Sequence, residues 1–397
     1  MAAIDTGRSE TTARVAFYND PKNRGIIYQV LLIVTIVGGG TWLVLNAIAN
    51  LKAQGKTMGF DFLWRTSGFD IGFTLFDFDR TSYYWEVFLV GLTNTLLVSV
   101  VSIFLATILG FFLGIARLSK NWIVAKIALF YVEVTRNIPL LLWLFVWYFA
   151  VLKAMPAVKQ SHSIFDIFFV NQRGIFVPRL LFDERFVWVV GALIVAMVGT
   201  VLLRVLAKRR LDATGRRFPV FLTALIVLLG LPLIVFLVSG SQIGVEVPTL
   251  TGFNFKGGYD LPPELIAMIL GLTLYTATFI GEIVRSGIEA VNRGQTEASQ
   301  ALGLRDGDRL RLVVLPQAMR VIIPPLSSEY LSLTKNSTLG AAIGYPELAN
   351  VFAGTALNQT GKALEIIGLT MVVYLVFSLS TSLFMNWFNA RVALVER

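Results

Sequence analysis

One apolar stretch near the end of the chain carries ionisable and polar side chains that could bind a charged solute. The segment 329–342, EYLSLTKNSTLGAA, holds an acid and a base six residues apart. Ionisable groups in a membrane-spanning segment usually face a cavity or a charged partner, because hydrocarbon solvates them poorly. Lys335 could bind a carboxylate and Glu329 an ammonium, while neighbouring polar groups could add hydrogen bonds. These neighbours are Asn336, Ser337 and Thr338.

Two interpretations of this cluster stay open. In the first, Glu329 and Lys335 line a solute path, which Asn94 on an earlier apolar segment would also reach. In the second, each charge pairs within the protein and only stabilises it, as buried ion pairs often do. Catalytic and metal chemistry is not indicated, because the chain has no cysteine and a single histidine, His162. We therefore predict no catalytic residues and no metal site.

The segments that must position these residues are long and apolar. Of the 397 residues, 55% are hydrophobic and 15% are charged, and the mean hydropathy is +0.70. Apolar runs of about 20 residues can cross roughly 30 Å of hydrocarbon as α-helices, whereas β-barrels show short alternating segments. We predict an all-α, polytopic membrane helix bundle with about eight transmembrane helices. They lie near 26–49, 87–117, 127–152, 186–205, 220–238, 264–283, 321–344 and 366–388.

The third of these spans is interrupted by the polar sequence VEVTRNIP at 132–139. Glu133, Arg136 and Pro139 are costly in lipid unless protein or water faces them. We therefore predict an interfacial or bent helix that then crosses the membrane.

Basic residues in the loops predict the orientation of the chain, because cytoplasmic loops are enriched in lysine and arginine. The loop after the fourth span holds five basic residues against one acid, Asp212; they are Lys208, Arg209, Arg210, Arg216 and Arg217. This pattern places both termini in the cytoplasm. The net charge of +9 then follows from orientation, and we predict no binding to nucleic acid.

A polar loop at 297–316, EASQALGLRDGDRLRLVVLP, separates the sixth span from the seventh. By the same orientation it is cytoplasmic. Its first residues favour a helix, which Gly303 can end in a left-handed cap. The sequence Asp-Gly-Asp at 306–308 predicts a turn, and a second helix can start near Arg309. A short helix with an apolar edge could dock in a groove of another protein; a solvated surface loop is the alternative.

The spacing within the polar loop is more specific. It contains Glu-Ala-Ser at 297–299, three residues, Gly303, nine residues, Val313, one residue and Leu-Pro at 315–316. This closely resembles the EAA loop of ABC importer permeases, in which Ala and Ile stand where this chain has Ser299 and Val313. The flanks, including GEIVRSGIEAVNRGQTEA and LTKNSTLGAAIGYPEL, resemble the polar amino acid branch of that family. The resemblance covers about 87–153 and 263–390, and the elongated layout resembles permeases of general L-amino acid uptake systems.

The resemblance implies a type I ABC importer transmembrane domain with extra helices at 87–390. An insertion at 154–262 would interrupt it and carry two extra transmembrane helices. Residues 1–86 would form a cytoplasmic tail, the first transmembrane helix and an external loop, and 391–397 a cytoplasmic tail. The polar loop would be the coupling helix that docks on an ATPase. Its anchor residues would be Glu297, Ala298, Ser299, Gly303, Leu315 and Pro316.

The resemblance also implies the function and the partners. The chain would be the permease subunit of an ATP-driven importer in the bacterial inner membrane. It would pair with a second homologous permease, bind a cytoplasmic ABC ATPase dimer and receive L-amino acids from a periplasmic binding protein. It would be no enzyme and would hold no cofactor, since the ATPase would use ATP and Mg. The alternatives are a self-contained secondary transporter or channel for small polar solutes, and a membrane-embedded enzyme.

Two further residue pairs are predicted to be structural. Gly110 and Gly114 form a GxxxG pattern in the second span, which allows close packing of helices. Glu282 and Arg285 stand three residues apart and can pair across one helical turn. A gating role for this ion pair is the alternative.

Overall fold

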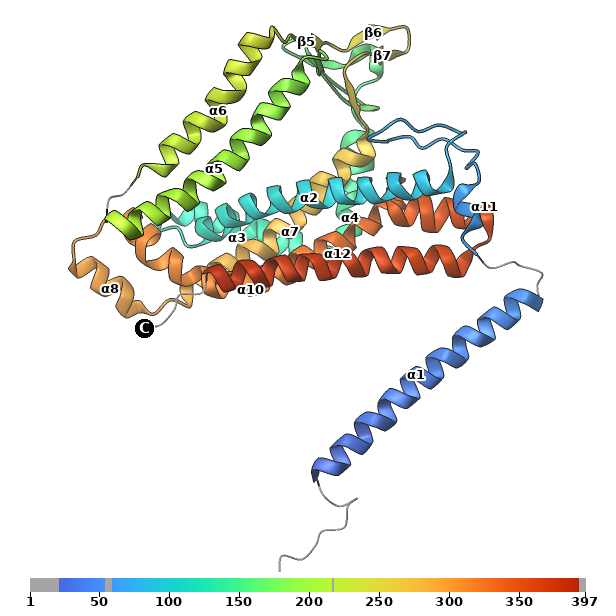
Figure 1. Cartoon of the computed structure of the whole chain (residues 1–397), viewed down its shortest axis with the longest axis horizontal. Helices are drawn as coiled ribbons and strands as arrows, with labels where there is room; N and C mark the ends of the chain where they lie inside the picture. The colour runs from blue at the N-terminus through green and yellow to red at the C-terminus, as the bar shows by residue number, and fades with distance from the viewer. Residues whose placement is uncertain (1–20, 54–58, 216–217, 393–397) are drawn as a thin grey trace, which may run out of the picture.

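The computed structural model describes residues 21–53, 59–215 and 218–392, and these form a mostly helical protein (Figure 1). Seven helices in these ranges are long and apolar enough to cross a membrane, and a bent pair makes an eighth. The prediction of about eight spans is therefore confirmed. The long helices are α1 (Pro21–Ala53), α2 (Tyr84–Arg117), α5 (Phe186–Thr214), α6 (Val220–Ser239), α7 (Pro263–Glu289), α10 (Leu315–Asn336) and α12 (Ala363–Val392).

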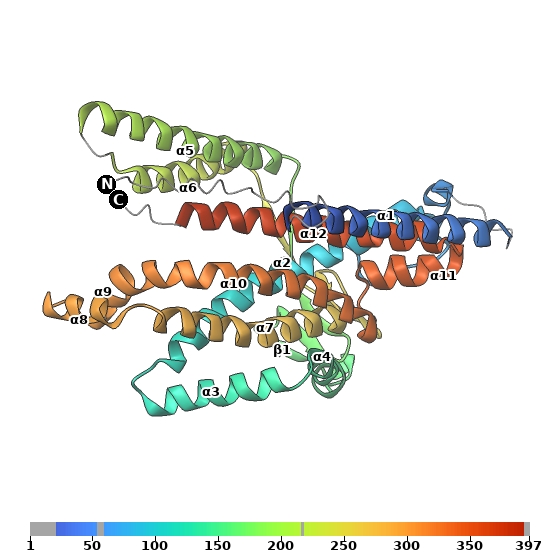
Figure 2. The same cartoon turned by 90° about the horizontal axis from the view of Figure 1, so that it is seen from below.

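The centre of the bundle is built on α7, which packs against α2 on one side and α10 on another (Figure 2). Small residues let α2 and α7 approach closely. A Cβ added to Gly110 would lie 2.5 Å from Cγ2 of Ile280, and one added to Gly114 would lie 2.7 Å from the carbonyl oxygen of Gly281. Leu272 and Val284 of α7 are fully buried in the same core. The GxxxG pattern of α2 thus faces α7 within one chain.

The bent pair consists of α3 (Trp122–Asn137), α4 (Leu140–Phe145) and the π-helical segment Val146–Leu152, with a bend of 104° between its two arms. The helix breaks at Pro139, which has no amide proton and disfavours helical backbone in the residue before it. The indole nitrogen of Trp143 donates a hydrogen bond across the break to the carbonyl oxygen of Thr135 at 3.2 Å. The prediction of a bent helix is confirmed.

The chain between α4 and α7 adds the antiparallel hairpin of α5 and α6 and three small sheets. The sheets have the orders β1-β2-β3-β8, β4-β5 and β6-β7, all antiparallel. The strands are β1 (His162–Ile164), β2 (Phe168–Asn171), β3 (Gly174–Val177), β4 (Arg179–Phe182), β5 (Ile243–Glu246), β6 (Thr249–Thr251), β7 (Asn254–Lys256) and β8 (Tyr259–Leu261).

The sequence analysis did not predict these strands. Each strand is three or four residues long, too short for hydrophobic alternation to be distinctive. Strands β3 and β4 pair with β8 and β5 across the α5–α6 hairpin. The ring of Phe255 on β7 packs against those of Phe169 on β2 and Phe176 on β3. Long-range pairing therefore forms structure that local sequence does not reveal.

Two short helical segments cover the end of the bundle near α11 (Leu357–Thr360). They are the 3-10 helix Asp61–Trp64 and the π-helix Ala349–Ala356. Phe62 is 1% exposed and its ring lies against that of Phe352. The amide of Gly59 donates a hydrogen bond to Oε1 of Glu365 at the start of α12, at 2.8 Å. These contacts attach the segment before α2 to the last spans.

Candidate functional site

The first residues of the polar loop form the second half of α8 (Arg293–Ala301), whose two ends are capped by the chain itself. The side chain of Asn292 accepts a hydrogen bond from the amide of Gly294 at 2.8 Å. At the other end the amide of Leu304 donates to the carbonyl oxygen of Ser299 at 3.1 Å, and that of Gly303 to Gln300 at 2.9 Å. This is the Schellman arrangement, and it needs the positive φ of 74° that Gly303 adopts. The predicted helix and its left-handed cap are confirmed.

The exposed surface of α8 combines charged, small and apolar residues. Glu297 and Ala298 are exposed. Ser299 is 3% exposed, and its hydroxyl donates to the carbonyl oxygen of Thr296 at 2.7 Å. Leu302 has 82% of its surface exposed at the helix end. A leucine this exposed on a capped helix, beside a small residue, forms a compact surface that can enter a groove.

The segment after Gly303 differs from its prediction. Residues 306–308 do not form a turn; they open the short helix α9 (Asp306–Arg309). Asp306 lies in the first helical turn, where a carboxylate is favourable to the helix dipole. It pairs with Nζ of Lys120 at 2.8 Å and with Nη2 of Arg309 at 2.9 Å. A π-helical segment, Leu310–Val314, then joins α9 to α10, which opens with the half-buried Leu315 and the exposed Pro316.

The two long helices that flank the polar loop are packed tightly against each other. A Cβ added to Gly287 near the end of α7 would lie 2.3 Å from Cγ1 of Ile322 on α10. Ala318 and Ile322 are fully buried at this contact. Close-packed interiors transmit displacement rather than absorb it. A force on α8 would therefore move α7 and α10 together.

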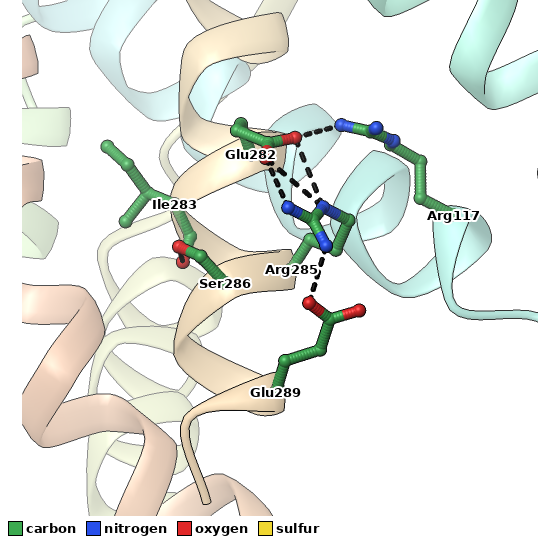
Figure 3. A network of polar contacts seen from close by, with 6 residues as sticks. All are labelled: Arg117, Glu282, Ile283, Arg285, Ser286 and Glu289. Carbon is green, nitrogen blue, oxygen red and sulfur yellow. Dashed lines mark hydrogen bonds and ion pairs between the residues drawn. The ribbon is translucent and has the colours of Figure 1, made fainter.

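A network of ion pairs stands on the last two turns of α7, and Figure 3 shows its members. Arg285 pairs with Oε1 of Glu282 at 2.5 Å and with Oε2 of Glu289 at 2.5 Å. Arg117, at the end of α2, pairs with the same Glu282. The predicted Glu282–Arg285 pair is confirmed, but the sequence analysis missed Arg117, which ties α2 to α7. An ion pair between two helices forms only when folding brings the helices together.

The ionisable and polar residues of the segment 329–338 lie where α10 ends and the 3-10 helix Ser337–Ile343 begins. Glu329 is half-buried and Lys335 is exposed. Within the described ranges, no oppositely charged atom lies within 4.0 Å of either side chain. Neither charge therefore forms a close ion pair within the described part of this chain.

The polar neighbours in this region are largely occupied by backbone contacts. The hydroxyl of Ser337 is fully buried and donates to the carbonyl oxygen of Thr334 at 2.7 Å. The hydroxyl of Thr338 donates to the carbonyl oxygen of Lys335 at 2.8 Å. Asn336 is half-buried at the end of α10. Of this group, Lys335 is the most accessible polar side chain.

Asn94 on α2 is fully buried and binds backbone atoms. Its Nδ2 donates to the carbonyl oxygens of Phe73 at 3.0 Å and Pro346 at 2.9 Å. The hydroxyl of Tyr345 donates in turn to the carbonyl oxygen of Asn94 at 3.0 Å. Asn94 thus connects three segments of the chain, and a solute would have to displace protein to reach it.

Glu347 is a buried carboxylate that the sequence analysis did not single out. It accepts hydrogen bonds from the amides of Ala349 and Asn350, each at 2.7 Å, and from the hydroxyl of Tyr374 at 3.1 Å. Burial raises the pKa of its carboxyl to about 7, although the two amides act in the opposite direction. Glu347 caps the π-helix Ala349–Ala356 and holds it to α12. Its position after an ordinary Tyr-Pro pair gave no signal of burial.

Known proteins resemble this chain over its whole length. The family model for the binding-protein-dependent transport system inner membrane component matches residues 189–394. The general L-amino acid transport system permease protein AapQ of Rhizobium johnstonii is 48% identical, over 100% of this chain and 99% of AapQ. The putative amino-acid ABC transporter permease protein YhdX of Escherichia coli is 47% identical, over 98% and 99% of the two chains.

A third relative extends the comparison. The glutamate/glutamine/aspartate/asparagine transport system permease protein BztB of Rhodobacter capsulatus is 40% identical, over 95% of this chain and 96% of BztB. The chain therefore belongs to the family of binding-protein-dependent transport system inner membrane components, as a non-catalytic, multi-pass permease subunit whose ATPase is a separate protein.

Proposed function

We propose that this permease carries L-amino acids across the inner membrane and is driven by an ATPase dimer that binds α8. The observation that carries this proposal is the capped helix α8, with Leu302 82% exposed, between two tightly packed spans. The amino acid substrate is supported by the names of AapQ, YhdX and BztB, all of which describe amino acid permeases. A self-contained transporter is not supported, since members of this family work with a binding protein.

In this proposal the anchor residues have different roles. Glu297, Ala298 and Leu302 would contact the ATPase, because all three are exposed. Ser299 and Gly303 would shape the helix, because the side chain of Ser299 is buried and Gly303 forms the C-terminal cap. Leu315 and Pro316 would pass movement to α10. The contact between Gly287 and Ile322 supports joint movement of α7 and α10 when the ATPase closes.

The proposed arrangement in the membrane follows from the same loop. With α8 in the cytoplasm, both termini are cytoplasmic and the strands of the insertion face the periplasm. Residues 87–390 would form the transmembrane domain, with 154–262 as its insertion, preceded by 1–86 and followed by the tail 391–397. A second homologous permease would complete the path, and a periplasmic binding protein would deliver the solute. ATP and Mg would be used by the ATPase, with no cofactor in this chain.

Purification of the intact complex tests this proposal. The tagged full-length permease, extracted from its native membrane in a mild detergent, is expected to retain an ABC ATPase and a second permease. Mass spectrometry of the purified material identifies both subunits. Repeated recovery of the permease alone, in detergents that preserve helix packing, would contradict the assignment of α8 as an ATPase-binding helix.

For the solute path we propose Lys335 as the group that binds the carboxylate. Glu329 and Lys335 are separated by about 9 Å along the helix axis and by about a third of a turn. The two charged groups of an α-amino acid sit on a single carbon atom, so one solute would not engage both side chains closely. Asn336 and Thr338 stay in the proposed path beside Lys335. We leave out Asn94 and Ser337, whose side chains are fully buried.

Lys335→Met is expected to raise the KM for L-amino acid uptake about tenfold or more, because a hydrogen-bonded charge pair contributes about 1.5–3 kcal/mol. Uptake of labelled amino acid is measured in proteoliposomes that contain the complete complex. Lys335→Arg should retain most of the affinity. Lys126→Met, which removes another exposed lysine, is the matched control. Unchanged KM and rate in Lys335→Met, with the complex assembled, would remove Lys335 from the path.

A further inference from the structure

The end of the α5–α6 hairpin opposite the strands carries a basic surface. The two helices run side by side, and the chain turns between them after Thr214 (Figure 1, Figure 2). Four cations lie exposed along the last turns of α5: Arg204, Lys208, Arg209 and Arg210. No acidic atom of the described ranges lies within 4.0 Å of any of them. Their charge is therefore not neutralised inside the part of the chain that the structure describes.

Two hollows flank Phe218 on this surface, and both contain a cation against an apolar wall. The first has a volume of about 320 Å³ and is lined by Arg204, Ala207, Lys208, Leu211, Phe218 and Val220. The second has a volume of about 180 Å³ and is lined by Leu203, Leu206, Ala207, Arg210 and Phe218. Ala207 belongs to both because its small side chain leaves the space on either side of Phe218 open.

Arg204 lies within an apolar stretch of α5, where its charge needs contact with water or with an anion. It lies ten residues before the end of the helix, or about 15 Å along its axis. The surface around it is apolar and uncovered: Val201 is 61% exposed, Leu202 57% and Leu206 58%. A cation among lipid-facing side chains must extend toward the interface or bind an anion there. Lys208, one helical turn further on, extends this cationic row toward water.

We propose that this surface binds the headgroup of an anionic phospholipid. The phosphodiester would lie between Arg204 and Lys208, with Arg210 as a second contact on the far side of Phe218. The acyl chains would run along the exposed valines and leucines of α5. Basic pockets at the ends of membrane helices attract anionic lipids by charge, and charge-assisted hydrogen bonds to phosphate add geometry. Free phosphate carries the same charged group, but it has no acyl chains that could cover the apolar walls of the hollows.

Orientation of the chain in the membrane requires only charge in a loop and no particular shape. A lipid site requires both the cations and the hollows. The two explanations are therefore separated by a variant that keeps every charge and removes the space. Ala207→Trp does this, because Ala207 lines both hollows.

The test is native mass spectrometry of the purified full-length chain titrated with dioleoyl phosphatidylglycerol or dioleoyl phosphatidylcholine. The wild type is expected to bind the anionic lipid at least about tenfold more tightly. The triple variant Arg204→Gln, Lys208→Gln, Arg210→Gln should lose affinity on the order of 100-fold, since each cation near the surface contributes about fivefold. Ala207→Trp should lose the preference although its charge is unchanged.

The matched control is Arg24→Gln, Lys52→Gln, Lys126→Gln, which removes the same charge from exposed positions elsewhere and should bind like the wild type. Equal binding of both lipids by the wild type would overturn the proposal. So would an unchanged preference in Ala207→Trp, or an equal loss in the control. Displacement of phosphatidylglycerol by an equal concentration of inorganic phosphate would assign the site to a free anion instead. None of these readouts depends on transport or on ATPase binding.

Discussion

Leu302→Glu is expected to abolish amino acid uptake while leaving the permease folded. Leu302 is 82% exposed at the end of α8, so a charge there leaves the folded state almost unaffected, within about 0.5 kcal/mol. In the proposed complex the same side chain is buried in an ATPase groove. Apolar residues at the centre of an interface commonly contribute 2 kcal/mol or more, and a buried unpaired carboxylate adds a further penalty. We expect ATPase binding to weaken by about 100-fold.

The measurement combines recovery of the ATPase with the tagged permease and uptake by proteoliposomes. Gln300→Glu provides the matched control, because it adds the same charge to an exposed position of α8 and keeps Leu302. Leu302→Met should retain both binding and uptake, since methionine preserves the apolar contact. If Leu302→Glu still recovers the ATPase and transports at the wild-type rate, the end of α8 is not the docking surface.

Gly110→Leu is expected to have the largest effect on the stability of the permease itself. A Cβ at position 110 would lie 2.5 Å from Cγ2 of Ile280 and 3.0 Å from the carbonyl oxygen of Ala277. A backbone atom cannot rotate away, so α2 and α7 must separate. Overpacking of a core costs about 1–3 kcal/mol, and we expect the upper end of that range. For a chain of this size the melting temperature should fall by roughly 5 °C.

Thermal unfolding in detergent, followed by the loss of monodisperse protein, measures this effect. Gly199→Leu is the control: it makes the same change within a membrane span, and its added Cβ meets no atom within 4 Å apart from its chain neighbours and the backbone of its own helix. Its melting temperature should stay within about 1 °C of the wild type. An equal loss in both variants would mean that the cost comes from leucine in a span rather than from the contact of α2 with α7.

Local features of this chain were predictable from the sequence because their causes are local. Runs of apolar residues define the long helices wherever the bilayer must be crossed. Pro139 ends α3 through its own ring, and Gly303 ends α8 because glycine tolerates a positive φ. The turn predicted at residues 306–308 was wrong. Asp-Gly-Asp is a common turn sequence, but Asp306 pairs with Lys120 and Arg309, and the segment becomes helical.

The candidate site was predictable only in part. The spacing of the polar loop identified α8, but the burial of Ser299 and the 82% exposure of Leu302 depend on how α8 packs against α9 and the segment Leu310–Val314. Lys335 and Glu329 stood out as charges in an apolar span. Asn94 looked equally suited to a solute path, yet its amide binds Phe73 and Pro346. A polar residue in a span can form hydrogen bonds with a solute or with the backbone, and its neighbours in the folded structure determine which.

By itself the sequence determined that this chain crosses a membrane repeatedly, roughly where its spans lie, and that one polar loop has the spacing of the EAA loop of ABC importer permeases. Hydrophobicity, helix capping and proline act over a few residues, so their effects can be deduced along the chain. Only the tertiary structure decided that β4 pairs with β5 beyond a helical hairpin, that Arg117 of α2 joins Glu282 of α7, and that Glu347 is buried. Those contacts join residues distant in the chain, and their free energies exist only once the helices have packed.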